Sequence, residues 1–393
     1  MSGSTGRAAA SRHAAPGACA SGTIGCGVIG TGYMGTCHAQ ALARVGHNFE
    51  PALRPELVAV ADAGLAGAEA ARKRFGFARA TDDWRELLAD PAIGLVSIAT
   101  PNLLHKEMAL AALAAGKHVW CEKPLALNAV DARELARAAA AAGTVNLVGY
   151  NYLRSPAVAF ARKLVAGGEL GAVTQFRAIF DEDFMGPASF PFTWRCETAL
   201  AGTGALGDMG SHLVNLAHFL VGPITEVSAG LATPIGERLD ADGRLRRVEN
   251  DDVSETLIRF ANGALGHLGC SRIAWGRKNG LDFELYGREG GLRFSQERFN
   301  EIQLFRPADR ADDNGFRTIL TGPPHPPFAR FTPGWGHGLG FNDLKVIEAA
   351  HLLEAIAEGT PAWPDFAEGW RVEAVIEAIA KSAATRRWET VEA

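Results

Sequence analysis

Three polar side chains at helical spacing, Asp208, His212 and Asn215, form the part of this sequence best suited to acid–base chemistry. They follow the glycine-rich stretch 202–207, and positions i, i + 4 and i + 7 share one face of a helix. A histidine can accept a proton from an alcohol near neutral pH, and a neighbouring carboxylate can orient the ring and raise its pKa. In the alternative interpretation, Asp208 only caps the helix and His212 is a satisfied core histidine.

A second candidate is the tripeptide Glu122-Lys123-Pro124, which follows the apolar run 118–121. It is expected at the end of a buried strand, where the proline fixes the turn that presents both charges. A lysine held there can stabilise negative charge on a substrate oxygen. The alternative is an ordinary Glu–Lys pair on the surface.

A glycine-rich turn after the first apolar run indicates nucleotide binding. Gly30-Thr31-Gly32-Tyr33-Met34-Gly35 fits the pattern G-x-G-x-x-G between a predicted strand and a predicted helix. Gly30 permits the tight turn, Gly32 lets a pyrophosphate approach the backbone, and Gly35 lets the helix pack closely on the strand. The helix N-terminus then offers unpaired N–H groups to the phosphates.

The next predicted strand, 56–62, ends in Asp62. An acid at this place can bind a ribose 2′-hydroxyl, although it could instead cap the following helix. Asp62 would also repel a 2′-phosphate, and Ala63-Gly64-Leu65 supplies no cation to receive one. The sequence therefore favours NAD over NADP as the cofactor.

The segment Thr100-Pro101-Asn102-Leu103-Leu104-His105 follows another buried run, 93–100. Its proline should end the strand and lead the chain across the sheet edge where ligands bind in doubly wound folds. Asn102 and His105 are expected to face the cofactor. Alternatively, Asn102 caps a helix and His105 is a solvated surface residue.

These motifs need two domains to position them, and a chain of 393 residues is too long for one ordinary core. From residue 23 to 150, apolar runs alternate with helical segments, which predicts a doubly wound parallel sheet of the Rossmann type. After residue 150, alternating apolar positions and glycine turns predict a large, mostly antiparallel sheet. We expect an α/β protein with a flexible tail over 1–22, a dinucleotide-binding domain over 23–150, and a substrate and oligomerisation domain over 151–393.

The composition excludes several classes of function. The apolar share is 47% and the formal charge is −5, so the sequence lacks the excess of positive charge that binds nucleic acid or an anionic membrane. The sequence has no apolar run long enough to span a bilayer, and residues 1–22 lack the apolar core of a secretory signal. Six cysteines without a C-x-x-C pair predict a reducing cytoplasm and no metal site.

Together, these motifs resemble the Gfo/Idh/MocA family of NAD(P)-dependent oxidoreductases from about Thr23 to the C-terminus, with Glu122-Lys123-Pro124 as the most specific match. The segments 181–185 and 335–343 are similar to those of inositol dehydrogenases that also oxidise aldoses. Many of these have aspartate where this chain has Asn215. The resemblance implies a Rossmann domain followed by an open antiparallel sheet that assembles homodimers or homotetramers.

The resemblance also assigns roles to residues. It implies oxidation of a secondary alcohol of a cyclic polyol or sugar to a ketone or lactone, with His212 as the base, Lys123 stabilising the alkoxide and Asp208 orienting His212. Cofactor contacts fall on the glycine turn 30–35, Asp62, the segment Thr100–His105, Glu122, Lys123 and Asn151. Lys123, Asp208 and His212 are also expected to contact the sugar, together with Tyr152, Arg154, Asp183, Trp194, Asn215 and His337.

Two other functions remain open at this point. Some members of the family cleave glycosides through transient oxidation with a tightly held NAD, and some relatives are dinucleotide-binding sensors without turnover. The presence of Lys123, Asp208 and His212 together disfavours a sensor, since binding alone would not need all three. Whether His337 acts in its own pocket or in that of a neighbouring subunit is also left open.

Overall fold

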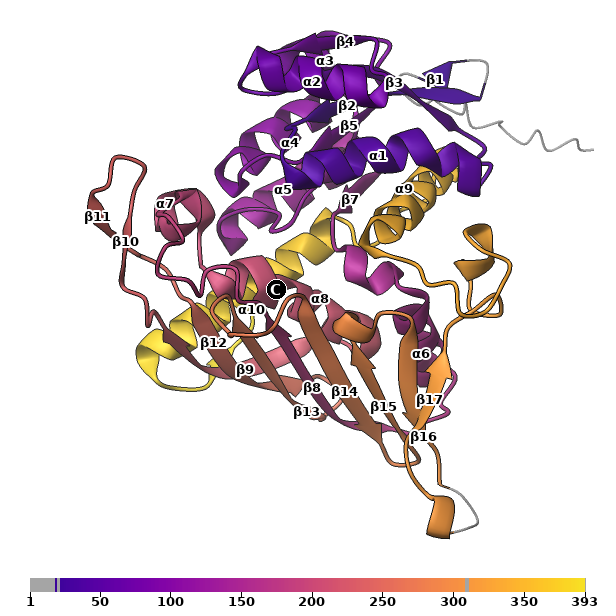
Figure 1. The fold of residues 1–393 in the computed structure, drawn as a ribbon, viewed down its shortest axis with the longest axis vertical. Helices are drawn as coiled ribbons and strands as arrows, with labels where there is room; N and C mark the ends of the chain where they lie inside the picture. The colour runs from indigo at the N-terminus through magenta and orange to yellow at the C-terminus, as the bar shows by residue number, and fades with distance from the viewer. Residues whose placement is uncertain (1–17, 20–21, 308–310, 393) are drawn as a thin grey trace, which may run out of the picture.

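The computed structural model describes residues 18–19, 22–307 and 311–392, which form two α/β domains with helices between their two sheets (Figure 1). Most of the tail expected over residues 1–22 lies outside the described residues. Within it, β1 (Ala18–Cys19) pairs antiparallel with β2 (Thr23–Ile29).

The N-terminal sheet has six parallel strands in the order β4-β3-β2-β5-β6-β7. Besides β2, they are β3 (Arg54–Ala61), β4 (Arg79–Thr81), β5 (Leu95–Ile98), β6 (His118–Cys121) and β7 (Asn146–Val148). Every residue of β5 and β6 is buried, because helices cover both faces of a parallel sheet. The strand order reverses between β2 and β5, and ligands bind at such a switch point.

The helices of this domain connect its strands in the expected alternation. They are α1 (Tyr33–Asn48), α2 (Leu65–Phe75), α3 (Arg85–Ala89), α4 (His105–Ala114) and α5 (Ala129–Ala142). The glycine turn lies between β2 and α1, at the switch point. The doubly wound parallel sheet predicted from the sequence is therefore confirmed.

The second sheet has nine strands in the order β17-β16-β15-β14-β8-β13-β12-β9-β18. Neighbouring strands of this sheet run antiparallel, except for β8 and β13, which run parallel to each other. The strands are β8 (Val173–Asp181), β9 (Ile224–Ala232), β12 (Val253–Phe260), β13 (Leu265–Ser271), β14 (Gly280–Gly287), β15 (Gly291–Ser295), β16 (Glu301–Phe305), β17 (Arg317–Leu320) and β18 (Glu389–Thr390). The prediction of a large, mostly antiparallel sheet is confirmed.

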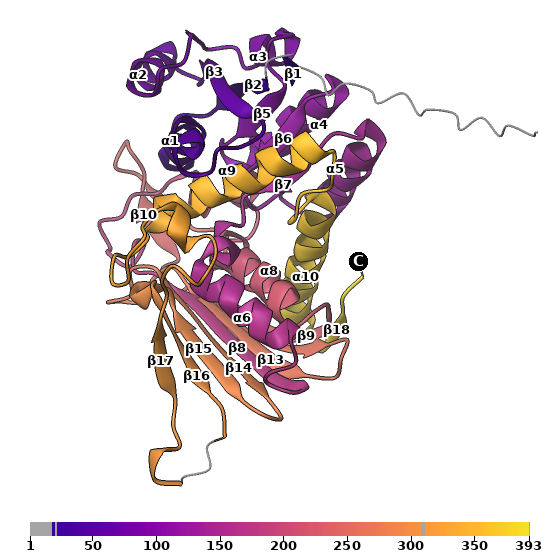
Figure 2. The ribbon, with the colours of Figure 1, turned by 90° about the vertical axis from the view of Figure 1, so that its right-hand side faces the viewer.

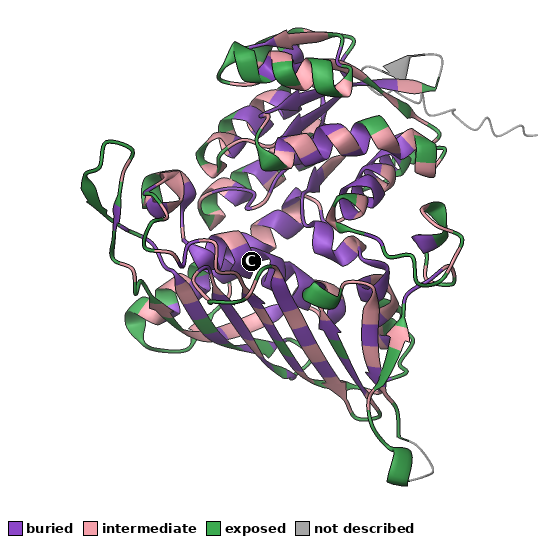
Figure 3. Ribbon diagram, in the orientation of Figure 1, coloured by how far each residue is buried: buried purple, intermediate pink, exposed green. Residues whose placement is uncertain are grey.

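Helices cover one face of this sheet and leave the other face open (Figure 2). The covering helices are α6 (Pro156–Ala166), α8 (Ser211–Leu220) and α10 (Phe366–Thr385). Buried and exposed positions alternate along β12, and Figure 3 shows this banding on the sheet. The hairpin of β10 (Glu237–Leu239) and β11 (Leu245–Arg247) and the short α7 (Thr198–Ala201) stand beside the site described below.

Helix α9 (Phe341–Glu358) follows the large sheet in sequence but packs in the core of the N-terminal domain. Its Val346 and Leu353 join the same buried cluster as Ile24 and Val28 of β2. The helix thereby connects the two domains. Within the described part of the chain, no helix is long and apolar enough to cross a membrane.

Candidate active site

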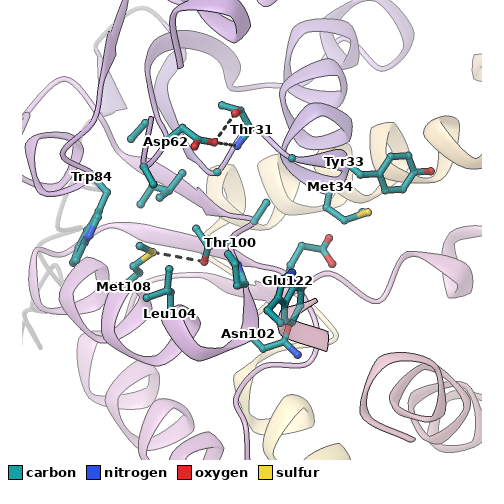
Figure 4. A pocket seen from close by; sticks show the side chains of 18 of the residues that line it. Thr31, Tyr33, Met34, Asp62, Trp84, Thr100, Asn102, Leu104, Met108 and Glu122 are labelled. Atoms are coloured by element: carbon teal, nitrogen blue, oxygen red, sulfur yellow. Dashed lines mark hydrogen bonds between the residues drawn. The ribbon is translucent and has the colours of Figure 1, made fainter. Parts of the chain in front are cut away.

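A cleft of about 860 Å³ opens at the carboxyl edge of the parallel sheet (Figure 4). Gly30 adopts φ +94°, and a Cβ on Gly35 would lie 1.9 Å from the carbonyl oxygen of Gly30, so both positions require glycine. A Cβ on Gly32 would meet no protein atom within 4 Å, because this glycine faces the open cleft. Helix α1 begins directly after Gly32 without a side-chain cap or an acid in its first turn. These features fit a bound pyrophosphate.

The far end of the cleft is acidic. The Asp62 carboxylate accepts hydrogen bonds from the Thr31 N–H at 2.7 Å and the Thr31 hydroxyl at 2.5 Å, as Figure 4 shows. Asp82 and Asp83 also line this end, together with Trp84 and Arg85. The carboxylates fit the hydroxyl groups of an adenosine ribose better than a 2′-phosphate.

The segment after β5 lies only partly as expected. Thr100, Pro101 and Asn102 line the cleft, and the Asn102 amide donates to the carbonyl oxygen of Ala201 at 3.0 Å. His105 is fully buried, with its ring nitrogens 2.8 Å and 2.9 Å from the carbonyl oxygens of Pro124 and Thr100. The expectation that His105 faces the cofactor is therefore wrong, because its ring lies in the interior and joins the turn at Thr100 to the turn at Pro124.

The turn after β6 places Glu122 at the base of the cleft. One carboxylate oxygen lies 2.6 Å from Lys345 Nζ and 2.7 Å from His38 Nε2, and the other accepts from the Lys123 N–H at 3.2 Å. Burial disfavours the charge, but the Lys345 ammonium and His38 outweigh it and hold the pKa of Glu122 well below its usual range. Glu122 therefore acts as a fixed negative charge beneath Lys123.

Lys123 reaches from this turn to Asp208. Its Nζ lies 2.6 Å from Asp208 Oδ1 and 2.8 Å from the Asp208 carbonyl oxygen. Arg195 adds a second cation, with Nε 3.9 Å from Asp208 Oδ2. Burial opposes ionisation of Asp208, but the charges of Lys123 and Arg195 lower its pKa to about 2. Asp208 is thus the counter-ion of Lys123.

The chain enters α8 through a π-helical turn, Leu206–Gly210, which the sequence did not predict. The Asp251 carboxylate holds its start by accepting from the N–H groups of Gly204 at 2.7 Å and Leu206 at 2.8 Å. A π-helical turn contains one residue more than an α-helical turn. It therefore rotates the residues before it about the helix axis, relative to the residues that follow. Asp208 therefore meets Lys123 rather than standing in line with Asn215.

His212 projects from the first turn of α8 into an aromatic environment. Its side chain is only 6% exposed, and its ring lies 4.7 Å from that of Tyr152 and 5.6 Å from that of Tyr150. No hydrogen bond from the described residues reaches its ring nitrogens. Burial, together with the charge of Lys123, lowers the pKa of His212 well below 6.5. The charge of Asp208 favours the protonated form, in the direction expected, but burial outweighs it and the net shift of the pKa is downward.

A second hollow of about 380 Å³ adjoins the cleft and shares six lining residues with it: Tyr33, Met34, Glu122, Lys123, Arg195 and Asp208. Its other lining residues are mostly aromatic or apolar: Asn151, Tyr152, Phe180, Glu182, Phe184, Phe190, Met209, His212 and Phe341. The amide nitrogen of Asn151 is buried, and none of the described residues hydrogen-bonds to it. A pocket with aromatic walls and a few polar groups can bind the C–H faces and hydroxyl groups of a sugar ring.

Tyr152 lines this hollow, as expected for a sugar contact. Asn151, expected at the cofactor, also lines the hollow, whereas Trp194, expected at the sugar, lines the cleft. Four expected sugar contacts line neither space. Arg154 is buried and donates to the carbonyl oxygen of Trp363, and Asp183 pairs with Lys278 at 2.7 Å. Asn215 is 2% exposed, with its amide 3.2 Å from Glu368, and His337 lies in an exposed loop with Nδ1 3.0 Å from the Trp335 carbonyl oxygen. The assignments of Arg154, Asp183 and Asn215 are corrected, because other partners occupy these side chains. A contact of His337 with the pocket of a neighbouring subunit stays a prediction, since a single chain does not test it.

Sequence reasoning missed Glu182 and Arg195, which both line the hollow. A signal for Glu182 was present, since Phe176, Ala178 and Phe180 alternate on the buried face of β8 and residue 182 continues that face. Asp183, the residue chosen instead, falls on the other side. No spacing rule identifies Arg195, which lies within the short 3-10 turn Trp194–Cys196.

A dinucleotide cleft joined to a pocket with a histidine, a lysine and an aspartate defines a two-domain dehydrogenase. Residues 24–150 match the model described as an oxidoreductase family with an NAD-binding Rossmann fold, and residues 158–293 match the Gfo/Idh/MocA C-terminal domain. The chain belongs to the Gfo/Idh/MocA family of oxidoreductases, and its N-terminal domain is an NAD-binding Rossmann domain.

Several relatives cover nearly the whole chain. Levoglucosan dehydrogenase of Pseudarthrobacter phenanthrenivorans is 41% identical over 368 residues, which span 90% of this chain and 94% of that protein. A structure of levoglucosan dehydrogenase with NADH and levoglucosan has a TM-score of 0.92 at 40% identity, covering 94% of this chain and 99% of that one. Glucose-6-phosphate 3-dehydrogenase of Bacillus subtilis is 27% identical over 86% of this chain and 91% of its own length.

Proposed function

We propose that this oxidoreductase oxidises a secondary ring hydroxyl of an uncharged sugar or cyclic polyol to a ketone or lactone. The observation that carries the proposal is the position of Lys123, Asp208 and His212 around the hollow that adjoins the cofactor cleft. NAD bound in the cleft would supply the hydride acceptor. The same residues disfavour a protein that only senses the dinucleotide.

His212 acts as the general base in this proposal. Its lowered pKa keeps the ring neutral at physiological pH, so a ring nitrogen is free to accept the hydroxyl proton. The ammonium of Lys123 stabilises negative charge as it develops on the substrate oxygen. Asp208 holds that ammonium in place through its 2.6 Å contact. The aromatic walls exclude water from the transfer.

The charges of the pocket support an uncharged substrate. Lys123 and Arg195 both face Asp208, so neither is a spare cation for a phosphate group. The identity to levoglucosan dehydrogenase favours a pyranose ring, and levoglucosan is the first compound to test. Inositols and aldopyranoses remain within the proposed class. NAD is favoured over NADP because Asp62 stands at the ribose end of the cleft.

The proposal is tested by following NADH formation with NAD or NADP and a panel of compounds. The panel contains levoglucosan, myo- and scyllo-inositol, D- and L-glucose, glucose 6-phosphate and several glycosides. We expect NADH with at least one uncharged ring polyol and none with glucose 6-phosphate. Hydrolysis of a glycoside without net NADH would instead establish the glycosidase activity.

We further propose that the protein forms a homodimer or homotetramer through the open face of the nine-stranded sheet. Leu257 and Leu265 on this face are about half exposed, at 54% and 50%. Light scattering after size exclusion should give a multiple of the chain mass, reduced by Leu257→Arg. A cytoplasmic location is also proposed, since five cysteines of the described chain are unpaired and buried.

A further inference from the structure

We propose that Glu182 selects the substrate by accepting hydrogen bonds from sugar hydroxyls other than the one that is oxidised. This inference rests on the proposed function, because it concerns the same pocket. It defines the substrate as a ring with free hydroxyl groups away from the reacting carbon and without a negative charge.

Glu182 is held firmly at the end of β8. Its N–H donates to the carbonyl oxygen of Ser271 at 2.8 Å, and its own carbonyl oxygen accepts from the Ala274 N–H at 2.9 Å. It continues the face of the strand that carries Phe180, and both residues line the hollow with His212. The side chain therefore projects from a rigid element toward the space that the sugar would occupy.

The Glu182 carboxylate stands apart from the other charges of the pocket. Lys123 and Asp208 pair with each other, Arg195 lies over the Trp194 ring at 4.4 Å, and Glu122 is bound by Lys345 and His38. Among the described residues, nothing hydrogen-bonds to the carboxylate of Glu182. The acceptor positions of this partly buried carboxylate are therefore free to take hydrogen bonds from a ligand. Sugar hydroxyls are donors of the required kind.

The groups facing Glu182 make its charge sensitive to pH. Burial and the negative charge of Asp208 raise the pKa of Glu182 to about 7, with Asp183 adding to this and Lys123 and Arg195 opposing it. Tyr33 of α1 and Tyr152, which precedes α6, also face it from the other side of the pocket. Asp208 and His212 titrate below this range. A change in sugar binding near pH 7 would therefore report on Glu182.

The ionised and neutral forms of Glu182 bind hydroxyls differently. The carboxylate can accept from two hydroxyls at once, whereas the neutral acid has less acceptor capacity and resembles a glutamine amide in shape and charge. Sugar affinity should therefore rise with pH in the wild type. Glu182→Gln should bind the sugar with the affinity of the wild type at low pH, and its affinity should not rise at high pH.

The experiment measures the Kd of levoglucosan by calorimetry on the complex of the full-length protein with NADH, at about pH 6 and about pH 8.5. We expect the wild type to bind about tenfold more tightly at the higher pH, which is within the range for hydrogen bonds to a charged group. Glu182→Gln should show no such change in Kd between the two pH values. Glu169→Gln, an exposed carboxylate paired with Arg306, is the matched control and should keep the wild-type response.

An unchanged pH response in Glu182→Gln, or a loss of kcat with unaltered Kd, would overturn the role of Glu182. Glu182→Ala should weaken binding further at both pH values, and the near-isosteric glutamine variant carries the test if the alanine variant does not fold. Wild-type protein that binds levoglucosan without oxidising it would refute the proposed function alone, since the Kd comparison still decides the role of Glu182. Wild-type protein that binds none of the sugars of the panel would overturn both.

Discussion

Lys345 Nζ lies 2.6 Å from Glu122 Oε1, and this buried ion pair joins α9 to the turn that carries Lys123. Lys345 also contacts Glu348 at 2.8 Å, and Glu122 contacts His38 of α1 at 2.7 Å. Lys345, Glu348 and His38 are fully buried, so the charge of Lys345 is balanced by carboxylates within the protein rather than by solvent. The position of the proposed catalytic lysine therefore depends on a helix more than two hundred residues further along the chain.

Replacing Lys345 by methionine should strongly destabilise the protein. The change leaves two buried carboxylates without their cation, and breaking a buried pair in this way costs about 3–5 kcal/mol. Denaturant unfolding measures the effect. Lys381→Met is the control, because Lys381 pairs with Glu389 at the surface and should change stability by less than about 1 kcal/mol. A Lys345→Met protein as stable as the wild type would show that the network contributes nothing net.

Replacing His212 by alanine should lower kcat by about 10²–10⁴-fold, the range typical for loss of a general base. NADH binding, followed by fluorescence, should change little, because His212 lines the adjoining hollow rather than the cofactor cleft. His47→Ala, at an exposed position near the end of α1, is the control and should retain full activity. Near-wild-type kcat in His212→Ala would assign the base to another group.

Replacing Asp62 by alanine should weaken the preference for NAD. The variant loses the carboxylate beside Thr31 at the ribose end of the cleft, and we expect the KM for NAD to rise about tenfold or more. The KM for NADP should fall, since a repelling charge has been removed. Steady-state kinetics with both cofactors test this. An unchanged ratio of kcat/KM for the two cofactors would place cofactor choice elsewhere in the cleft.

The sequence predicted the parts of the site that depend on local pattern. The glycine turn, Asp62 and the tripeptide at Glu122 follow buried strands, and parallel topology alone brings strand ends to one edge. His105 was misassigned because pattern cannot show that Pro124 and Thr100, from two different turns, supply carbonyl oxygens to its ring. Long-range partners of this kind become visible only in the folded chain.

The helix of Asp208 shows a second limit of sequence reasoning. A regular helical spacing placed Asp208 in line with His212 and Asn215, but the π-helical turn at Leu206–Gly210 changes that register. The turn is held by Asp251, which lies more than forty residues away. Glu368 similarly removes Asn215 from the site. Local periodicity therefore placed Asp208 and His212 near each other but did not predict their contacts with the rest of the site.

Glu373 of α10 makes the stability of the protein depend on pH. It is 3% exposed, and one of its carboxylate oxygens is buried without a hydrogen-bond partner in the described part of the chain. Burial, together with the nearby charge of Glu377, raises the pKa of Glu373 to about 8. The folded state therefore holds a proton that the unfolded chain, with an ordinary glutamate pKa near 4.5, releases. Stability is greatest below that ordinary value and should fall as the pH rises from about 5 to 8.

Glu373→Gln should flatten this dependence, because a glutamine amide replaces the neutral acid without an ionisable group. Thermal unfolding at pH 5, 6.5 and 8 measures the melting temperature Tm. The Tm of the variant should increase steadily relative to that of the wild type as the pH rises. Glu358→Gln, at the exposed end of α9, is the control and should follow the wild type at every pH. A constant difference in Tm between Glu373→Gln and the wild type would mean that Glu373 is charged in the folded protein, paired with a group brought near by assembly.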